Sequence, residues 1–387
     1  MAIISFFHEV CVRGGKVGVV LYAIELGVTP HGIGLLLAVS QIFPALLAIS
    51  AGKASDRVDN KVLFLFTSLF GAVLYVLPTI GGAEILYVLV LFLGLVQIFF
   101  QATLQNMIGS LGEGTNRAKN FGVYSISSAL SSSVGPLVAG FAIDLAGFKN
   151  MFFIMGGIGL TAAILVVLFQ AYIPRTARKT FPRAEVTEQT KKKSSLDLLK
   201  RPRLRAAFIT SGILLTGSSI FNFYFSIYGK SIDMSASMIG TVLSINSAAF
   251  VIVRLMMPLL LRRYEESKLM IFTMLFSAFS MALIPMFEQY YILLLISFML
   301  GFGLGCGQPI AMTIIYNRSP KDRTGETVGI RLMINRFTAL LIPLVFGSLG
   351  SGFGVFPVYG VSSALLFYGG YIGIQEDKLH SRTGETP

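Results

Sequence analysis

Residues 31–82 read HGIGLLLAVSQIFPALLAISAGKASDRVDNKVLFLFTSLFGAVLYVLPTIGG. Two apolar runs, at 31–54 and 61–82, flank a short charged loop that contains Lys53, Arg57 and Lys61. A helix needs about 20 apolar residues to cross a hydrocarbon core of about 30 Å, and each run is long enough. The stretch therefore predicts two transmembrane helices joined by a polar turn.

The same pattern repeats along the whole chain. Of its 387 residues, 54% are hydrophobic and 13% are charged, and the mean hydropathy is +0.74. A soluble domain has about a quarter of its residues charged, so most of this surface must face lipid. Lipid admits helices or closed barrels, and the alternating segments typical of a barrel are missing. We predict an all-α membrane protein with twelve transmembrane helices, at 3–26, 31–54, 61–82, 84–110, 116–145, 148–173, 204–229, 235–262, 268–288, 290–317, 323–350 and 355–374.

One long polar stretch divides these helices into two sets of six. It predicts an N-terminal six-helix bundle at 1–173, a cytoplasmic linker at 174–203, a C-terminal six-helix bundle at 204–374 and a cytoplasmic tail at 375–387. The linker contains three consecutive lysines, Lys191, Lys192 and Lys193. Such a run is typical of a charged segment at a membrane surface, and a regulatory role is the alternative.

The basic residues are distributed unequally between the two sides of the membrane. With both termini on the cytoplasmic side, 24 of the 31 Lys and Arg residues lie in cytoplasmic segments, and only Lys149 and Lys230 lie in the opposite loops. The positive-inside rule therefore places both termini in the cytoplasm. The net charge of +12 does not indicate nucleic-acid binding, because the short basic loops lack interleaved aromatic residues and a soluble domain.

Several other function classes are not indicated by the sequence. The first apolar stretch is too long and too charged for a removable signal peptide, and a natural start upstream of Met1 is left open. Cys11 and Cys306 lie far apart inside apolar stretches, which predicts packing and no disulfide or metal site. No phosphate-binding loop or catalytic constellation is present, so we expect neither an enzyme nor a bound cofactor or metal.

The charged loop after the second predicted helix has a recognisable spacing. Its key positions are Gly52, Asp56, Arg57 and Lys61, and the spacing resembles the signature loop of the major facilitator superfamily (MFS). Here Asp59-Asn60 replaces the Gly-Arg that is usual in the family. The resemblance implies a conformational switch loop. Gly52 would allow close helix approach, and Asp56 would cap a helix or pair with a basic residue.

The fifth predicted helix carries a second pattern, made of small residues and one proline. It resembles the antiporter motif of MFS exporters, with Ser131 at a position where that motif prefers glycine. Small residues allow close, sliding helix contacts, and a proline bends a helix. The resemblance implies proton-coupled export, with simple packing as the alternative. The residues of this motif are Gly122, Ser131, Gly135, Pro136 and Gly140.

Ionisable side chains within these apolar helices predict functional or paired sites, because a charge at bilayer depth costs several kcal/mol. Glu9 and Arg13 are four residues apart and share a helix face. In the MFS, the equivalent helices line a central cavity. We therefore expect a substrate cavity lined by Arg13, Lys16, Gln41, Gln97, Gln101, Asn222, Asn246, Arg254, Gln308 and Arg331.

The charges within the helices are mostly positive. These helices contain five basic residues and one clear acid, Glu9. Such a surplus of positive charge favours an anionic small-molecule substrate. The alternatives are that Arg13 simply pairs with Glu9, and that Arg254 or Arg331 extends to the membrane surface.

Glu9 and His8 are the titratable groups near this cavity that a proton cycle can use. We hypothesise that Glu9 is the protonation site. Arg13 would hold Glu9 ionised, and substrate binding at Arg13 would free Glu9 to take a proton.

The resemblance to the MFS extends over nearly the whole chain. It implies two pseudo-symmetric six-helix bundles, each built from inverted repeats, in the inner membrane of a bacterium. We expect a monomeric secondary transporter that exports small organic compounds by alternating access, driven by protons. The alternative is a proton-coupled uptake permease for an organic anion, nutrient or vitamin. The sequence predicts neither the substrate nor the stoichiometry.

Overall fold

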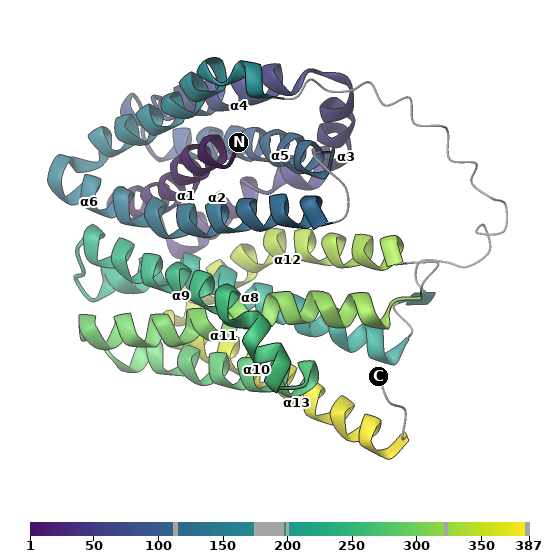
Figure 1. Cartoon of the computed structure of the whole chain (residues 1–387). Coiled ribbons are helices and arrows are strands. Elements are labelled where there is room, and N and C mark those ends of the chain that lie inside the picture. Colours follow the sequence, from purple (N-terminus) through teal and green to yellow (C-terminus); the bar gives the residue numbers. More distant parts are fainter. Residues whose placement is uncertain (111–114, 174–196, 199–200, 321–323, 384–387) are drawn as a thin grey trace. The chain divides into compact units, whose positions relative to one another are not determined.

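The computed structural model describes residues 1–110, 115–173, 197–198, 201–320 and 324–383, and these are helical apart from turns. The all-α prediction is confirmed (Figure 1). The α-helices are α1 (Ala2–Glu25), α2 (Pro30–Val39), α3 (Ile42–Arg57), α4 (Asn60–Leu74), α5 (Ala83–Ser110), α6 (Thr115–Leu168), α8 (Pro202–Ser231), α9 (Ala236–Arg263), α10 (Glu266–Leu283), α11 (Tyr290–Arg318), α12 (Thr324–Phe353) and α13 (Val355–Thr383). Short 3₁₀ turns lie at η1 (Leu77–Thr79), η2 (Gln170–Tyr172) and η4 (Ile284–Met286).

Ten helical segments among the described residues are long and apolar enough to cross a membrane. The α1 helix is not among them, since Glu9, Arg13 and Lys16 make it too charged for the same criterion. One segment, Val123–Leu168, is 46 residues long, about 69 Å at 1.5 Å per residue. It is interrupted at Gly147, whose φ of 80° and ψ of 170° are not helical. The count of twelve spans remains a prediction.

The surface of the helices is rich in large apolar side chains. Leu46 is 73% exposed, Ile49 75% and Leu145 84%. Soluble monomers rarely expose such residues in extended patches. This surface is suited to lipid, in agreement with the hydropathy of the sequence.

The second predicted helix, 31–54, corresponds to one apolar segment long enough to cross a membrane, Pro30–Arg57, but this segment is interrupted, because α2 ends at Val39 and α3 begins at Ile42. Pro44 explains the interruption, since it lacks the N–H that would bond the carbonyl of Ser40. That carbonyl lies against Gly94 of α5, where a Cβ would come within 2.2 Å of the oxygen. The break therefore allows α5 to approach closely.

The predicted ends of the chain's segments differ from the structure at two further places. The last helix was expected to end at 374, but α13 continues to Thr383, so the predicted tail begins as helix. The predicted linker, 174–203, lies mostly outside the described residues.

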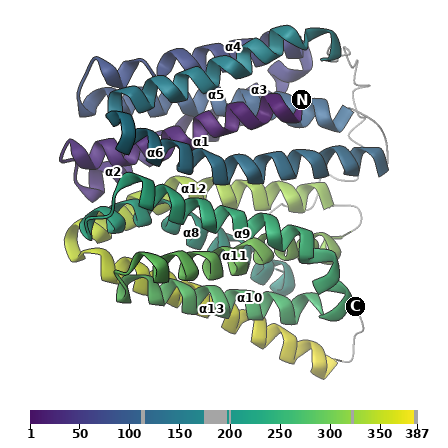
Figure 2. The same ribbon diagram turned by 60° about the vertical axis from the view of Figure 1, so that its left-hand side comes forward.

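The chain forms two compact units, which we name unit 1 and unit 2. Unit 1 comprises Met1–Lys179, Asn222–Ala248 and Pro343–Gly352, and unit 2 comprises Thr180–Phe221, Ala249–Ile342 and Phe353–Pro387. In unit 1, α1 lies along α6 (Figure 2). In unit 2, α10 packs against α11 and α13. The predicted six-helix halves remain a prediction.

A buried apolar cluster joins four helices at one end of unit 1. It packs side chains of α1, α4, α5 and α6 around the aromatic rings of Phe64 and Phe100, which lie 5.2 Å apart edge to face. Ile4 of α1 is part of this cluster, so the first turns of α1 are fixed in position. The charged residues of α1 follow within the next few turns.

Candidate functional site

A buried ion pair lies in the middle of α1. Arg13 Nε donates to Glu9 Oε2 over 2.9 Å, and the side chain of Glu9 is only 2% exposed while that of Arg13 is 35% exposed. The four-residue spacing places both groups on one helix face, as the sequence predicts. The pair brings a carboxylate into an apolar interior with its charge compensated.

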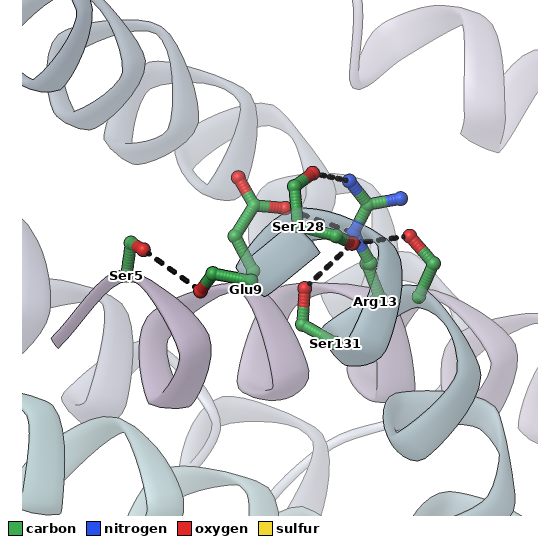
Figure 3. A network of polar contacts seen from close by, with 7 residues as sticks. Ser5, Glu9, Arg13, Ser128 and Ser131 are labelled. Atoms are coloured by element: carbon green, nitrogen blue, oxygen red, sulfur yellow. Dashed lines mark hydrogen bonds and ion pairs between the residues drawn. The ribbon is translucent and has the colours of Figure 1, made fainter. Parts of the chain in front are cut away.

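The other end of the arginine is held by α6. Arg13 Nη2 donates to Ser128 Oγ over 3.1 Å, and Figure 3 shows the guanidinium between Glu9 and Ser128. Ser131 and Ser132 donate to the backbone carbonyl of Ser128, so their hydroxyls are used within α6. The guanidinium therefore has one ionic and one neutral partner, on two helices.

Two glycines make this contact between α1 and α6 possible. A Cβ on Gly14 would lie 2.7 Å from the carbonyl oxygen of Gly135, and a Cβ on Gly135 would lie 2.8 Å from the nitrogen of Gly14. Side chains at either position would separate the helices. Gly135, which the sequence assigns to the antiporter-like motif, is thus a packing residue beside the ion pair.

His8 lies next to the pair in an aromatic environment. Its ring stacks on Phe100 of α5 at a centroid distance of 3.6 Å. The ring is buried, and its Nε2 has no hydrogen-bond partner among the described residues. His8 is therefore adjacent to Glu9 and carries an unused polar atom.

A glutamine of α5 lies near the same ion pair. Gln101 lies beside the Glu9 carboxylate. Gln97 and Lys16 are half-buried, and Gln41 donates to Ser40 Oγ at the break between α2 and α3. Of the residues predicted for the cavity, Arg13 and Gln101 meet at Glu9.

A second arginine, in unit 2, has a different set of partners. Arg331 of α12 donates from Nε to Ser211 Oγ of α8 over 3.0 Å, from Nη1 to Met312 Sδ over 3.2 Å, and from Nη2 to Gln308 Oε1 over 3.1 Å. The structure thus brings together Arg331 and Gln308, both predicted, and Ser211, which sequence reasoning missed. All three acceptors are neutral.

The remaining predicted cavity residues differ in their burial. Arg254 and Asn222 are exposed, and Asn246 is buried. Each of them has an interaction within the protein. Whether they share a cavity with the two arginines stays a prediction.

The second half of the antiporter-like motif packs on α9 in unit 1. A Cβ on Gly140 would lie 2.4 Å from the carbonyl oxygen of Ala236, and a Cβ on Gly240 would lie 2.4 Å from that of Pro136. The predicted close helix contact is therefore present at these two glycines. Gly122 lies in α6, but its surroundings lie outside the description.

An acidic side chain that sequence reasoning missed reinforces this contact. Asp144 of α6 accepts hydrogen bonds from the backbone N–H groups of Ala236, over 3.1 Å, and Ser237, over 2.8 Å. These are the first residues of α9, where free N–H groups and the helix dipole favour a negative charge. The sequence shows the acid near a helix end, but the partner is distant in sequence.

A similar contact joins α2 and α12 in unit 1. The backbone N–H of His31 donates to Ser351 Oγ over 2.8 Å, and its Nδ1 lies 3.0 Å from Ser348 Oγ. A Cβ on Gly34 would lie 2.3 Å from the carbonyl oxygen of Pro343. The two helices are therefore in backbone contact.

The predicted switch loop differs in detail from the prediction. Gly52, Asp56 and Arg57 belong to the last turns of α3, and Lys61 belongs to α4. A Cβ on Gly52 would meet no described atom within 4 Å, so the close approach expected there is wrong for this conformation. Asp59 caps α4 through the N–H of Lys61.

Asp56, which was expected to cap a helix or to pair with a basic residue, bonds a neutral amide instead. Its Oδ1 accepts a hydrogen bond of 2.8 Å from Asn106 of α5, whose amide also donates to Ser55. The loop is thereby attached to α5. A switching role of the loop stays a prediction.

Comparison with known proteins agrees with this architecture. The Major Facilitator Superfamily model matches residues 3–343. The Multidrug resistance protein MdtG of Proteus mirabilis (strain HI4320) is 24% identical over 360 residues, which cover 90% of this chain and 87% of that protein. The uncharacterised MFS-type transporter YuxJ of Bacillus subtilis (strain 168) is 22% identical over 340 residues, covering 87% and 86%.

Solved structures show the same fold at low sequence identity. The nucleoside transporter NupG superposes with a TM-score of 0.74 at 15% identity, covering 97% of both chains. A bacterial homologue of the human lysosomal transporter Spinster gives 0.77 at 11% identity, covering 97% of this chain and 96% of that one. The chain belongs to the Major Facilitator Superfamily and is a multi-pass membrane transporter, which confirms the resemblance seen in the sequence.

Proposed function

We propose that the protein exports small organic compounds by proton-coupled alternating access. The observation that carries this proposal is the buried Glu9–Arg13 pair of α1, braced by Ser128 of α6. It is supported by the relatives named as multidrug resistance proteins and by the antiporter-like series on α6. Ionisable groups placed inside membrane helices are typical of proton relays.

The proposed topology has twelve spans. Counting α1 as a span and dividing α6 at Gly147 adds two to the ten apolar segments. The chain would then form two six-helix halves, 1–173 and 204–374, with a cytoplasmic linker at 174–203 and both termini in the cytoplasm. We place it as a monomer in the inner membrane of a bacterium.

Glu9 is the proposed proton carrier. While ionised, it compensates the charge of Arg13. When Glu9 takes a proton, the guanidinium loses its ionic partner and keeps only neutral contacts such as Ser128. Protonation therefore changes the charge presented by α1, and a buried site makes that change energetically large. His8 and Gln101 lie next to the carboxylate and would assist the transfer.

The contacts of α6 with α9 and of α2 with α12 support the alternating-access part. The contacts of α6 lie near the end of α9 that is opposite to Arg262 and Arg263, and the contact of α2 with α12 lies at the start of α2 and near the end of α12. Under the proposed topology these are extracytoplasmic ends. Asp144 at the start of α9 would hold this end closed. The contact must break when the transporter opens outward.

Accessibility labelling tests this closure. Ser133 faces Ser244 of α9, so a Ser133→Cys thiol should react slowly with a polar maleimide. Adding Asp144→Asn should speed labelling several-fold, because an amide loses the charge that favours the helix N-terminus. Asp233→Asn is the control, since it removes a nearby exposed acid and asparagine tolerates the φ of 58° found there. Equal rates in both variants would exclude the role of Asp144.

Transport by the reconstituted protein tests the function itself. Proteoliposomes with an imposed proton gradient should accumulate a solute in the direction opposite to proton flow. We would screen paired anionic, neutral and cationic organic solutes in both directions. Accumulation in the same direction as proton flow would instead establish symport.

That second outcome corresponds to the alternative function, an uptake permease for an organic anion, nutrient or vitamin. The surplus of positive charge, seen at Arg331 with its neutral partners, is the observation that favours it. The two functions differ in direction and share the proton step. The screen distinguishes them without further assumptions.

A further inference from the structure

We propose that Arg331, Gln308 and Ser211 form an anion-recognition site, which binds the carboxylate or phosphonate group of the transported compound. The site lies within unit 2 and connects α12, α11 and α8. This inference rests on the proposed function, because it assigns the site to the transported solute. It also narrows the substrate class from small organic compounds to organic anions.

The first support is the absence of acids from the sequence around this site. No Asp or Glu occurs between residues 290 and 321 or between 327 and 375, and Asp233 is the single acid between 202 and 264. These ranges contain α11, nearly all of α12, and α8 and α9. The arginine is therefore a cation in apolar helices that supply no carboxylate at its depth, and such a charge requires compensation.

The guanidinium of Arg331 has N–H donors left for a ligand. An arginine has five N–H donors, and three of them bond Ser211, Met312 and Gln308. One N–H on each terminal nitrogen has no acceptor among the described residues. The thioether of Met312 is a weak acceptor, so an anionic oxygen would replace it with a gain in hydrogen-bond strength. Two oxygens of a carboxylate or phosphonate match such a planar pair of nitrogens.

A second donor stands unused beside the arginine. Gln308 presents Oε1 to Arg331, which leaves its Nε2 buried with no partner among the described residues. An unsatisfied buried donor is costly, and a bound anionic oxygen would satisfy it. Ser211, which is fully buried, adds a hydroxyl next to the guanidinium.

The helix that carries Gln308 can adjust around a ligand. Pro309 follows Gln308 within α11. Because proline has no N–H, it cannot donate to the carbonyl of Gly305, and the helix lacks one hydrogen bond there. The side-chain amide oxygen of Asn335, Oδ1, one turn after Arg331, is also buried without a partner in the described part of the chain. It offers an acceptor for a hydroxyl group, such as that of a phosphonate monoanion or a hydroxy acid.

Arg13, the arginine of α1, is unsuited to this role in its present state. The charge of Arg13 is compensated by Glu9 at 2.9 Å. Anion recognition is thus assigned to Arg331, and the ionic pair on α1 is left for the proton. A solute anion and a proton would then act on different groups.

Ligand-dependent thermal stability tests the site without any gradient. The chain has no Trp and two cysteines, Cys11 and Cys306, both buried, so a thiol-reactive fluorescent dye reports unfolding. The full-length protein is heated in uncharged maltoside micelles at fixed chloride. The probes are benzoate, phenylphosphonate, octanoate and octylphosphonate, each paired with the matching neutral amide and the matching amine. The proposal predicts that at least one acid raises the unfolding temperature while its amide and amine do not.

Substitutions then locate the effect. Arg331→Gln should weaken the apparent affinity for the anionic probe at least tenfold, and Arg331→Lys should weaken it less, because lysine keeps the charge but not the planar fork. Arg336→Gln is the matched control. It removes an exposed arginine from the same helix and should leave the affinity unchanged. A variant that unfolds before measurement is replaced by Gln308→Leu, which keeps Arg331 and removes the amide donor.

An anionic lipid headgroup presents the same chemistry as an organic phosphonate, so its contribution is measured separately. Phosphatidylglycerol is added to the micelles in place of the probes. Stabilisation by this lipid alone, abolished in Arg331→Gln, would assign the site to lipid and overturn the substrate role. Two further results would overturn the substrate role. In one, no acid stabilises the protein more than its amide and amine do. In the other, Arg336→Gln is the variant that loses binding.

The outcome is separable from the fate of the proposed function. Proton-driven export of cationic solutes would keep the exporter proposal and exclude the anion site. Anion binding that depends on Arg331, in a protein without proton-driven export, would keep the site and exclude the exporter.

Discussion

Two arginines in apolar helices of this transporter have opposite electrostatic situations. Arg13 of unit 1 lies 2.9 Å from the buried carboxylate of Glu9. Arg331 of unit 2 has a serine, a methionine and a glutamine around it. The same side chain is therefore neutralised in one unit and left as a net charge in the other.

The difference indicates a division of labour. A compensated pair responds to protonation of its acid, because the proton removes the compensation. An uncompensated cation responds to an anion from outside the protein. We assign the proton to Glu9 and the solute to Arg331, and a separate measurement tests each assignment.

The largest expected effect is the loss of coupling in Glu9→Gln. Glutamine keeps the shape and a hydrogen bond to Arg13, but it carries no titratable proton. Gradient-driven accumulation should fall at least tenfold, which corresponds to a loss of ~1.4 kcal/mol of driving free energy. Passive exchange of labelled solute should continue. Glu25→Gln, at the exposed end of the same helix, is the control. Full accumulation in Glu9→Gln would end the assignment of the proton.

The second effect compares the stability of the two arginine variants. Arg13→Gln leaves a buried acid without its cation, which costs about 3–5 kcal/mol. Arg331→Gln removes a cation that has no buried acid, so it should be nearly neutral or stabilising. Thermal unfolding with the thiol dye measures both, and Glu9→Gln combined with Arg13→Gln should recover part of the loss. Equal destabilisation of the two single variants would contradict the electrostatic difference.

A third, smaller effect compares the packing next to each arginine. A Cβ on Gly135 would lie 3.1 Å from that of Arg13 and 2.8 Å from the backbone nitrogen of Gly14, whereas a Cβ on Gly212, beside Ser211, would come no closer than 3.8 Å to its neighbours. Gly135→Ala should destabilise the protein by about 1–3 kcal/mol, and Gly212→Ala should be tolerated. The same thermal assay measures both. A stable Gly135→Ala variant with normal coupling would show that the α1–α6 contact is less rigid than described.

The smallest effect concerns the two serine partners. Ser128→Ala removes one neutral hydrogen bond from an arginine that keeps its ionic partner, so the loss should be near 1 kcal/mol in stability. Ser211→Ala should change stability by a similar amount but also weaken the binding of an anionic probe. Titration of the probe separates the two variants. Weaker probe binding in Ser128→Ala alone would reverse the assignment.

The sequence predicts the local features of this molecule well. Hydropathy predicts the helices, the boundary at Gly147 agrees with the expected break between 145 and 148, and the four-residue spacing predicts the Glu9–Arg13 contact. Each of these depends on neighbours in the chain. The interruption before Ile42 was also readable, because Pro44 removes a helical donor, but the hydropathy of the run obscured it.

The contacts missed by sequence reasoning join residues far apart in the chain. Ser211 reaches Arg331 across 120 positions, and Asp144 reaches the start of α9 across 92. Neither has a local signature, since one serine among many and one acid near a helix end predict no particular partner. The switch loop failed at Gly52 for a related reason, because a motif does not specify which helix face is packed in a given state.

The most direct test of the account is a zero-flux measurement of coupling in proteoliposomes, using an anionic solute that the screen identifies. The solute gradient that stops net transport is recorded while the pH gradient and the membrane potential are varied separately. Export of one monoanion for one proton moves two charges, so the account predicts that both gradients shift the balance point, and that Glu9→Gln removes the dependence on the pH gradient. A balance point that ignores the pH gradient in the native protein would contradict proton coupling at Glu9.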